Sequence, residues 1–117
     1  MNHKDLEVWK KAMDLVEQIY LITSTFPSSE LYGLTNQLRR AAVSIPSNIA
    51  EGSARKGDKE LLYFTNIATG SLAEIETQLL IGVRLKYVDE QNEIFDKITE
   101  VRKLLLGFRN YINRKGV

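Results

Sequence analysis

Apolar residues recur at helical spacing along almost the whole chain, and no segment shows the sustained alternation of a β-strand. The first such run extends from Leu6 to Ile22, and similar runs cover residues 31–49, 61–83 and 94–112. Each run supports a helix of about 21 to 27 residues, and the breaks are short, so consecutive helices should be antiparallel. The periodicity therefore predicts an all-α fold, an antiparallel up-down-up-down four-helix bundle in which residues 1–117 form a single domain.

The expected helix ends follow from residues that favour turns or caps. Pro27 disfavours a helical residue before it, so the first helix should end nearby. The second helix should end between Gly52 and Gly57, because either glycine can stop it. Asp58 and Asp89 are expected to be the N-caps of the third and fourth helices.

Three residues inside the expected helices are poor helix formers. Pro46 removes a backbone donor from the second helix, but Ile45 and Ile49 continue the apolar stripe across it, so we expect a kink and not a stop. Gly70 and Gly82 each cost the third helix about 1 kcal/mol relative to alanine. We interpret both glycines as positions where another helix packs closely.

The first helix carries more apolar surface than a bundle needs. Two neighbouring stripes cover roughly 200° of its circumference, whereas a core-facing stripe is little wider than 100°. The second and fourth helices have smaller extra patches. A thick core could absorb these residues, but we favour a homo-oligomer whose subunits bury them. The candidate interface residues are Val8, Leu15, Ile19, Val43, Pro46, Ala50, Phe95 and Leu106.

Composition excludes most catalytic and metal chemistry. The chain has no cysteine, and His3 is its only histidine, so thiol nucleophiles, zinc fingers, disulfide frameworks and histidine-dependent triads are ruled out. Residues 52–59 superficially resemble a phosphate-binding loop, but Asp58 stands where that loop needs lysine. We expect no enzyme activity, no catalytic residue, no metal and no cofactor.

The N-terminal residues and the lengths of the apolar runs indicate the compartment. The first seven residues, Met-Asn-His-Lys-Asp-Leu-Glu, are mostly polar or charged where a signal peptide needs an apolar core. No run approaches the roughly 20 apolar residues of a membrane span. We therefore expect a cytoplasmic protein with no membrane partner.

Charge is unevenly distributed along the chain, although the net charge is only +1. The net charge is −2 over residues 1–36, +3 over residues 37–59, −5 over residues 60–96 and +5 over residues 97–117. Basic residues at helical spacing on the second and fourth helices suit the phosphate backbone of RNA or DNA. The alternative is that acidic and basic blocks pair within the bundle or between subunits. The candidate nucleic-acid-binding residues are Arg39, Arg40, Arg55, Lys56, Lys59, Arg102, Lys103, Arg109 and Arg114.

Three segments carry a family resemblance that covers nearly the whole chain. They are Asp5–Ala12, Leu34–Gly52, with its mid-helix Ser-Ile-Pro followed by Asn-Ile-Ala-Glu-Gly, and Gly70–Leu79. In these segments the chain resembles the bacterial four-helix bundle proteins named for intervening sequences in 23S rRNA genes. Older naming of such proteins as ribosomal reflects gene location.

The resemblance implies a small non-enzymatic bundle that assembles into a ring of five subunits. The family is also similar to the accessory protein of diversity-generating retroelements, a basic pentamer to which binding of nucleic acid and of a reverse transcriptase is ascribed. The resemblance places Arg39, Arg40 and Arg55 where the family pattern has basic residues. It also implies a helix kink at Pro46 and close packing at Ala50 and Gly52. The net charge of +1 departs from the basic relatives.

These observations favour a homo-oligomer, by the resemblance a pentamer, that binds RNA or DNA without chemistry. The alternative is a structural scaffold whose partner is another protein.

Overall fold

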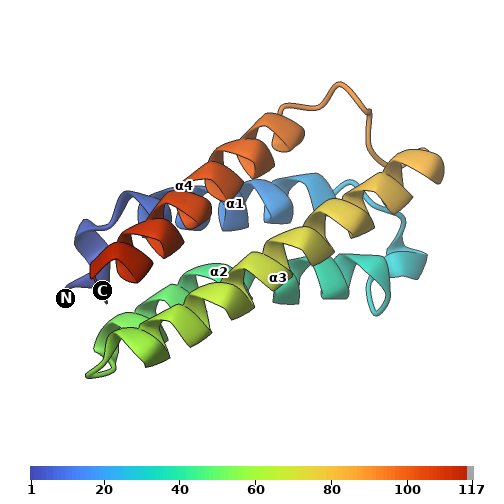
Figure 1. Ribbon diagram of the computed structural model, residues 1–117. Helices are drawn as coiled ribbons and strands as arrows, with labels where there is room; N and C mark the ends of the chain where they lie inside the picture. Colours follow the sequence, from blue (N-terminus) through green and yellow to red (C-terminus); the bar gives the residue numbers. More distant parts are fainter. Residues whose placement is uncertain (116–117) are drawn as a thin grey trace.

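The computed structural model describes residues 1–115, which form four α-helices and no β-strand (Figure 1). Consecutive helices run in opposite directions, so the predicted up-down-up-down bundle is confirmed. The bundle is elongated, with principal extents of 47 × 25 × 20 Å. The helices are α1 (Glu7–Thr23), α2 (Leu34–Ala54), α3 (Asp58–Arg84) and α4 (Ile94–Lys115), preceded by the short 3₁₀ helix η1 (His3–Asp5) and joined between α1 and α2 by η2 (Ser28–Glu30).

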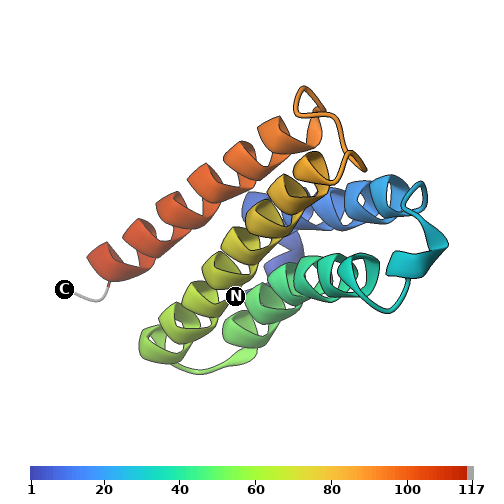
Figure 2. The ribbon, with the colours of Figure 1, turned by 90° about the vertical axis from the view of Figure 1, so that its right-hand side faces the viewer.

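Each helix packs against two others, in the closed order α1, α2, α3, α4 and back to α1 (Figure 2). The core between them consists of aliphatic side chains at helical spacing, and the largest are completely covered. Burying one such leucine or isoleucine contributes about 1.5–3 kcal/mol. Fully buried core residues from the four helices include Leu15, Ile45, Leu72 and Ile98.

Within residues 1–115 no helix is both long enough and apolar enough to cross a membrane.

Two of the expected helix caps are displaced. Asp58 is the first residue of α3, and Gly57 before it is the N-cap. Asp89 does not cap α4 but accepts a hydrogen bond at 2.8 Å from the backbone N–H two residues ahead of it, within the preceding turn. Asn92 has the capping role, because its Oδ1 accepts from the backbone N–H of Ile94 at 2.9 Å.

The poor helix formers behave differently from one another. The α2 helix continues through Pro46, so the expectation that this proline does not stop the helix is confirmed. A Cβ on Gly52 would lie 3.0 Å from a side-chain carbon of α3, and one on Gly82 would lie 3.3 Å from Val88 Cγ2, so both allow close packing. A Cβ on Gly70 would meet nothing within 4 Å. The interpretation of Gly70 as a close-packing position within the bundle is therefore wrong.

One carboxylate joins the start of α2 to the segment before α4. Glu30 Oε1 accepts from the backbone N–H of Leu34 at 3.2 Å, and Glu30 Oε2 accepts from the Tyr87 hydroxyl at 3.0 Å. This hydrogen bond to Glu30 raises the pKa of Tyr87, and burial and the carboxylate charge add to the effect. The Tyr87 ring also packs at 5.3 Å from the Phe26 ring. These contacts close the end of the bundle at which α1 ends and α2 begins.

Candidate nucleic-acid interface

Three of the eight candidate interface residues belong to the core of the subunit. Val8 is 4% exposed, and Leu15 and Ile19 are completely covered. Their stripe on α1 faces the centre of the bundle, while the neighbouring stripe borders the surface. The assignment of these three residues to an oligomer interface is therefore wrong.

An apolar groove runs between α1 and α2. It encloses about 350 Å³ and has no acidic or basic side chain other than one histidine. The helices run antiparallel along it, so the other α1 stripe faces the small residues of α2. Met13 and Val43 on its two sides are each 42% exposed. The groove brings together three predicted interface residues, Val43, Pro46 and Ala50, and its full lining is His3, Trp9, Met13, Val16, Val43, Pro46, Ser47 and Ala50.

The two remaining interface candidates lie on α4, apart from this groove. Phe95 is half-buried and packs against the core. Leu106 is 53% exposed. Of the two interface candidates on α4, only Leu106 is therefore largely exposed to solvent.

Two of the nine candidate nucleic-acid-binding residues form ion pairs with carboxylates. Arg55 pairs with Glu51 at 3.0 Å and with Glu60 at 3.9 Å. Arg102 on α4 pairs with Glu76 on α3 at 2.6 Å. All these side chains are partly exposed, so the pairs add little stability, but they lower the positive charge available to an anion.

The remaining seven candidates form no ion pair within residues 1–115. Lys56 lies in the turn between α2 and α3, Lys59 lies in the first turn of α3, and Arg114 lies near the end of α4, at the same end of the bundle (Figure 1). Lys103 and Arg109 lie earlier in α4. The last two members of the set, near the start of α2, are Arg39 and Arg40.

Arg39 and Arg40 line an open cavity of about 490 Å³ at the surface between α1 and α2. The cavity contains two guanidinium groups, one amide and one aromatic ring, and no carboxylate lines it. Val43 lines both this cavity and the apolar groove, so the two are neighbours. The lining residues are Tyr20, Asn36, Arg39, Arg40, Val43 and Ser44.

The guanidinium of Arg39 is held in a fixed orientation. Its Nε donates to Thr23 Oγ1 at 2.9 Å, and its central carbon lies 4.6 Å from the centre of the Tyr20 ring. Thr23 is only 3% exposed, and its hydroxyl donates to the Ile19 carbonyl oxygen at 2.7 Å. The threonine hydroxyl is therefore itself fixed and presents a lone pair to the arginine.

Sequence reasoning did not assign a ligand-binding role to Tyr20 and Asn36, which line this cavity, or to Thr23, which orients Arg39. Tyr20 continues an apolar stripe of α1 and so was indistinguishable from a core residue. Thr23 and Asn36 have no pattern that sets them apart from other polar residues near helix ends. Only the packing of α1 on α2 places Tyr20 and Thr23 against Arg39.

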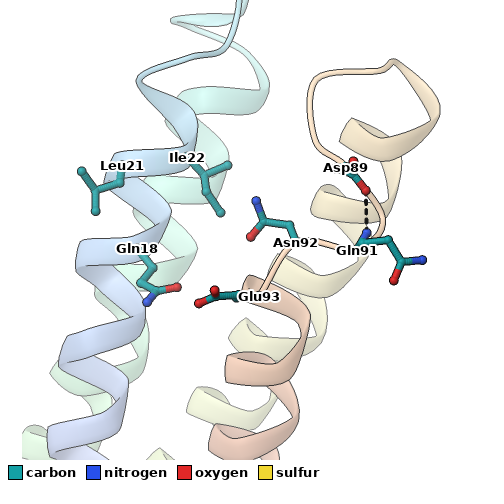
Figure 3. Close-up of a pocket in the computed structure, with 7 residues that line it drawn as sticks. All are labelled: Gln18, Leu21, Ile22, Asp89, Gln91, Asn92 and Glu93. Atoms are coloured by element: carbon teal, nitrogen blue, oxygen red, sulfur yellow. Dashed lines mark hydrogen bonds between the residues drawn. The ribbon is translucent and has the colours of Figure 1, made fainter.

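A second hollow has the opposite character. It encloses about 510 Å³ between α1 and the segment before α4, and its polar groups are amides and carboxylates (Figure 3). None of the predicted basic residues lines it, so it is no site for phosphate. Within the described part of the chain, no three histidine or carboxylate side chains gather as a metal ion would require. The lining residues are Gln18, Leu21, Ile22, Asp89, Gln91, Asn92 and Glu93.

Comparison with known proteins identifies the family. The family model described as 23S rRNA-intervening sequence protein matches residues 4–107. The chain belongs to this family. Its fold is similar to that of a protein of unknown function from the S23 ribosomal protein family of Bacteroides thetaiotaomicron VPI-5482, with a TM-score of 0.82. The two chains are 22% identical over 94% of this chain and 99% of that chain, which shows a shared fold. No curated protein sequence matches the chain.

Proposed function

We propose that this member of the 23S rRNA-intervening sequence protein family is a non-enzymatic homo-oligomer that binds RNA or DNA through its basic side chains. The observation that carries the proposal is that seven of the nine candidate cations remain outside ion pairs within residues 1–115. Internal pairing of acidic and basic blocks therefore accounts for Arg55 and Arg102 but not for the rest. Exposed cations without carboxylate partners are what a phosphate backbone requires.

The apolar groove between α1 and α2 supports the oligomeric part of the proposal. Trp9, Met13 and Val16 face Val43 and Ala50 across it without a charged residue in the lining. A second copy of the chain would remove this surface from water. A ring of five subunits is what the family resemblance implies, and symmetry would repeat the cations of one subunit around it.

Salt-dependent binding of RNA and single-stranded DNA tests the nucleic-acid part. Wild-type protein should retain labelled strands at about 50 mM salt, and log affinity should fall linearly with log salt concentration. Replacing both Arg39 and Arg40 with glutamine should weaken binding and reduce the salt slope by about 1.4, or about 0.7 for each lost contact to a single strand. Failure of the wild type to retain either strand would refute nucleic-acid binding.

A suitable control changes charge where a carboxylate already neutralises it. Arg102→Gln removes a cation that Glu76 already pairs with at 2.6 Å, so its effect on the salt slope should be the smaller. Sedimentation at micromolar concentration tests the oligomer separately, because a monomer at that concentration would contradict the subunit interface whatever the strands do.

Exposed apolar residues on α3 favour a protein scaffold as the second candidate function. Tyr63, Ile67 and Ile81 are 62%, 37% and 44% exposed, and their spacing of four and fourteen residues places them on one face of the helix. Such a face suits a polypeptide partner. Co-purification of a protein that survives nuclease and high salt would favour this function over nucleic-acid binding.

A further inference from the structure

We propose that the cavity of Arg39 and Arg40 is a built recognition site for a phosphodiester group of a single-stranded nucleic acid, with Arg39 as its oriented donor. This inference rests on the nucleic-acid binding proposed above and assigns that binding to one place. It separates these two arginines from Arg55 and Arg102, which pair with carboxylates, and from the other candidate cations, whose side chains no hydrogen bond within residues 1–115 fixes.

The donor geometry of Arg39 is the first step of the argument. A guanidinium has five N–H donors in one plane. The Nε–H of Arg39 is used by Thr23, and the four N–H groups at the other end have no acceptor among residues 1–115. Because the plane is fixed by Thr23 on one edge and by Tyr20 on one face, the unused N–H groups form a pre-oriented fork. Such a fork matches two oxygens of a phosphate group.

Electrostatics give the second step. Arg39 is half-buried, and neither Arg39 nor Arg40 forms an ion pair with a carboxylate of the described residues. A partly desolvated cation without a counter-charge is costly, and an anion relieves that cost. Arg40 adds a second charge at the rim, and Asn36 adds an amide donor. Two cations and a neutral donor around one cavity suit a single phosphodiester and its neighbour along a strand.

The shape of the cavity favours a strand over a free anion. Its volume of about 490 Å³ exceeds what one phosphate fills, and its walls include the partly exposed Tyr20 ring and the apolar Val43. Aromatic and apolar walls beside a phosphate site accept the face of a base or sugar. Duplexes keep their bases stacked inside, so this wall is useful to a single strand.

Arginine-to-lysine replacements test the site while keeping the charge constant. Arg39→Lys removes the planar fork and the contact to Thr23. Arg109→Lys is the matched control on α4, because Arg109 is exposed and forms no ion pair or side-chain hydrogen bond within residues 1–115. The probe is a fluorescent single-stranded RNA of about 20 nucleotides, read by anisotropy. Arg39→Lys should weaken binding about tenfold, since a hydrogen bond to a charged group is lost. Arg109→Lys should stay within about twofold, because a flexible surface contact depends on charge and not on shape.

Two further measurements keep the outcome decisive if Arg39→Lys disturbs folding. Thr23→Val is nearly isosteric and should also weaken binding of the probe, because it frees the Arg39 guanidinium without changing any charge. The circular dichroism spectrum of this variant should stay native. The Nε–Hε signal of Arg39 in a proton–nitrogen spectrum of wild-type protein should shift on addition of the RNA. An unlabelled strand should displace the probe, and inorganic phosphate at the same phosphate concentration should not.

Each result separates this site from the broader function. If wild type binds the probe but Arg39→Lys and Arg109→Lys weaken it equally, or the Arg39 signal does not move, the site is wrong and general nucleic-acid binding stands. If inorganic phosphate displaces the probe as well as RNA does, the cavity is a free-anion site and the proposal fails. If wild type binds no strand at about 50 mM salt, the proposed function fails together with the site.

Discussion

Leu15→Ala should destabilise the subunit strongly, whereas Met13→Ala, two residues earlier on the same helix, should not. Leu15 is completely covered by the core, and Met13 is 42% exposed in the groove between α1 and α2. Truncating a fully buried leucine costs about 2.7–5 kcal/mol, because apolar contact is lost and a cavity remains. Truncating a side chain that is nearly half in water costs well under about 1 kcal/mol in the subunit.

The assay is reversible thermal unfolding followed by helical circular dichroism, repeated at several protein concentrations. Unfolding entropy of about 2.1 cal/mol/K per residue gives about 0.25 kcal/mol/K for the 117-residue chain, so 3 kcal/mol lowers Tm by roughly 12 °C. If the protein is an oligomer, unfolding includes dissociation and Tm depends on concentration. Met13→Ala should then weaken that concentration dependence, while Leu15→Ala should lower stability at every concentration.

The opposite ranking of the two variants would refute the reassignment of the α1 stripes. If Met13→Ala were the more destabilising change at concentrations where wild type is monomeric, the exposed stripe would have to be part of the core. If Leu15→Ala reduced association without reducing subunit stability, Leu15 would be an interface residue after all.

The remaining predictions concern local features of the fold. Gly70→Ala should stabilise the bundle by about 1 kcal/mol, because alanine is the better helix former and an added Cβ meets nothing within 4 Å. Gly52→Ala should destabilise it by about 1–2 kcal/mol, because the new Cβ would lie 3.0 Å from a carbon of α3. Equal effects of the two variants in chemical denaturation would contradict the packing described. Because the pKa of Tyr87 is raised in the folded state, its protonated hydroxyl stabilises the fold fully below the ordinary tyrosine pKa of about 10, and this contribution is lost as pH rises through the folded pKa. Wild type should therefore lose stability above about pH 10 more steeply than Tyr87→Phe. Parallel curves of stability against pH would show that the contact to Glu30 contributes nothing. Asn92→Ala should cost about 1 kcal/mol through loss of the α4 cap, measured by thermal unfolding, and an unchanged Tm would argue against that cap.

The helices themselves were predictable from sequence because apolar spacing is a strong signal over long segments. Their ends were less so: Asp89 and Asn92 are both good capping residues, and only the path of the turn decides that Asn92 caps α4. The two stripes of α1 are similarly apolar, and a helical projection has no information on which neighbour each one faces. Leu15 and Ile19 were therefore predicted for an interface but are buried in the core, whereas Met13 on the neighbouring stripe is exposed and Val16 is partly buried.

The candidate site was predictable only in its charges. Arg39 and Arg40 stand out because adjacent arginines occur in a basic segment. The partners that orient Arg39 are Tyr20 and Thr23, which are 19 and 16 positions earlier in the chain. Their approach depends on the register of α1 against α2, which is set by side-chain packing along the whole pair. Likewise, pairing of Arg55 and Arg102 with carboxylates requires knowing which helices are neighbours.

The ring of contacts among the helices has a consequence for how the chain folds. Apart from α1 with α4, every packed pair of helices is consecutive in the chain. Contacts between segments near in sequence form early, and helical bundles of this kind fold within microseconds to milliseconds. Tyr20, Thr23 and Arg39 all lie on the α1–α2 hairpin, so the proposed phosphodiester site needs no long-range closure. Its geometry should be established before α4 docks, and a nascent chain would present it while the last helix is still being synthesised.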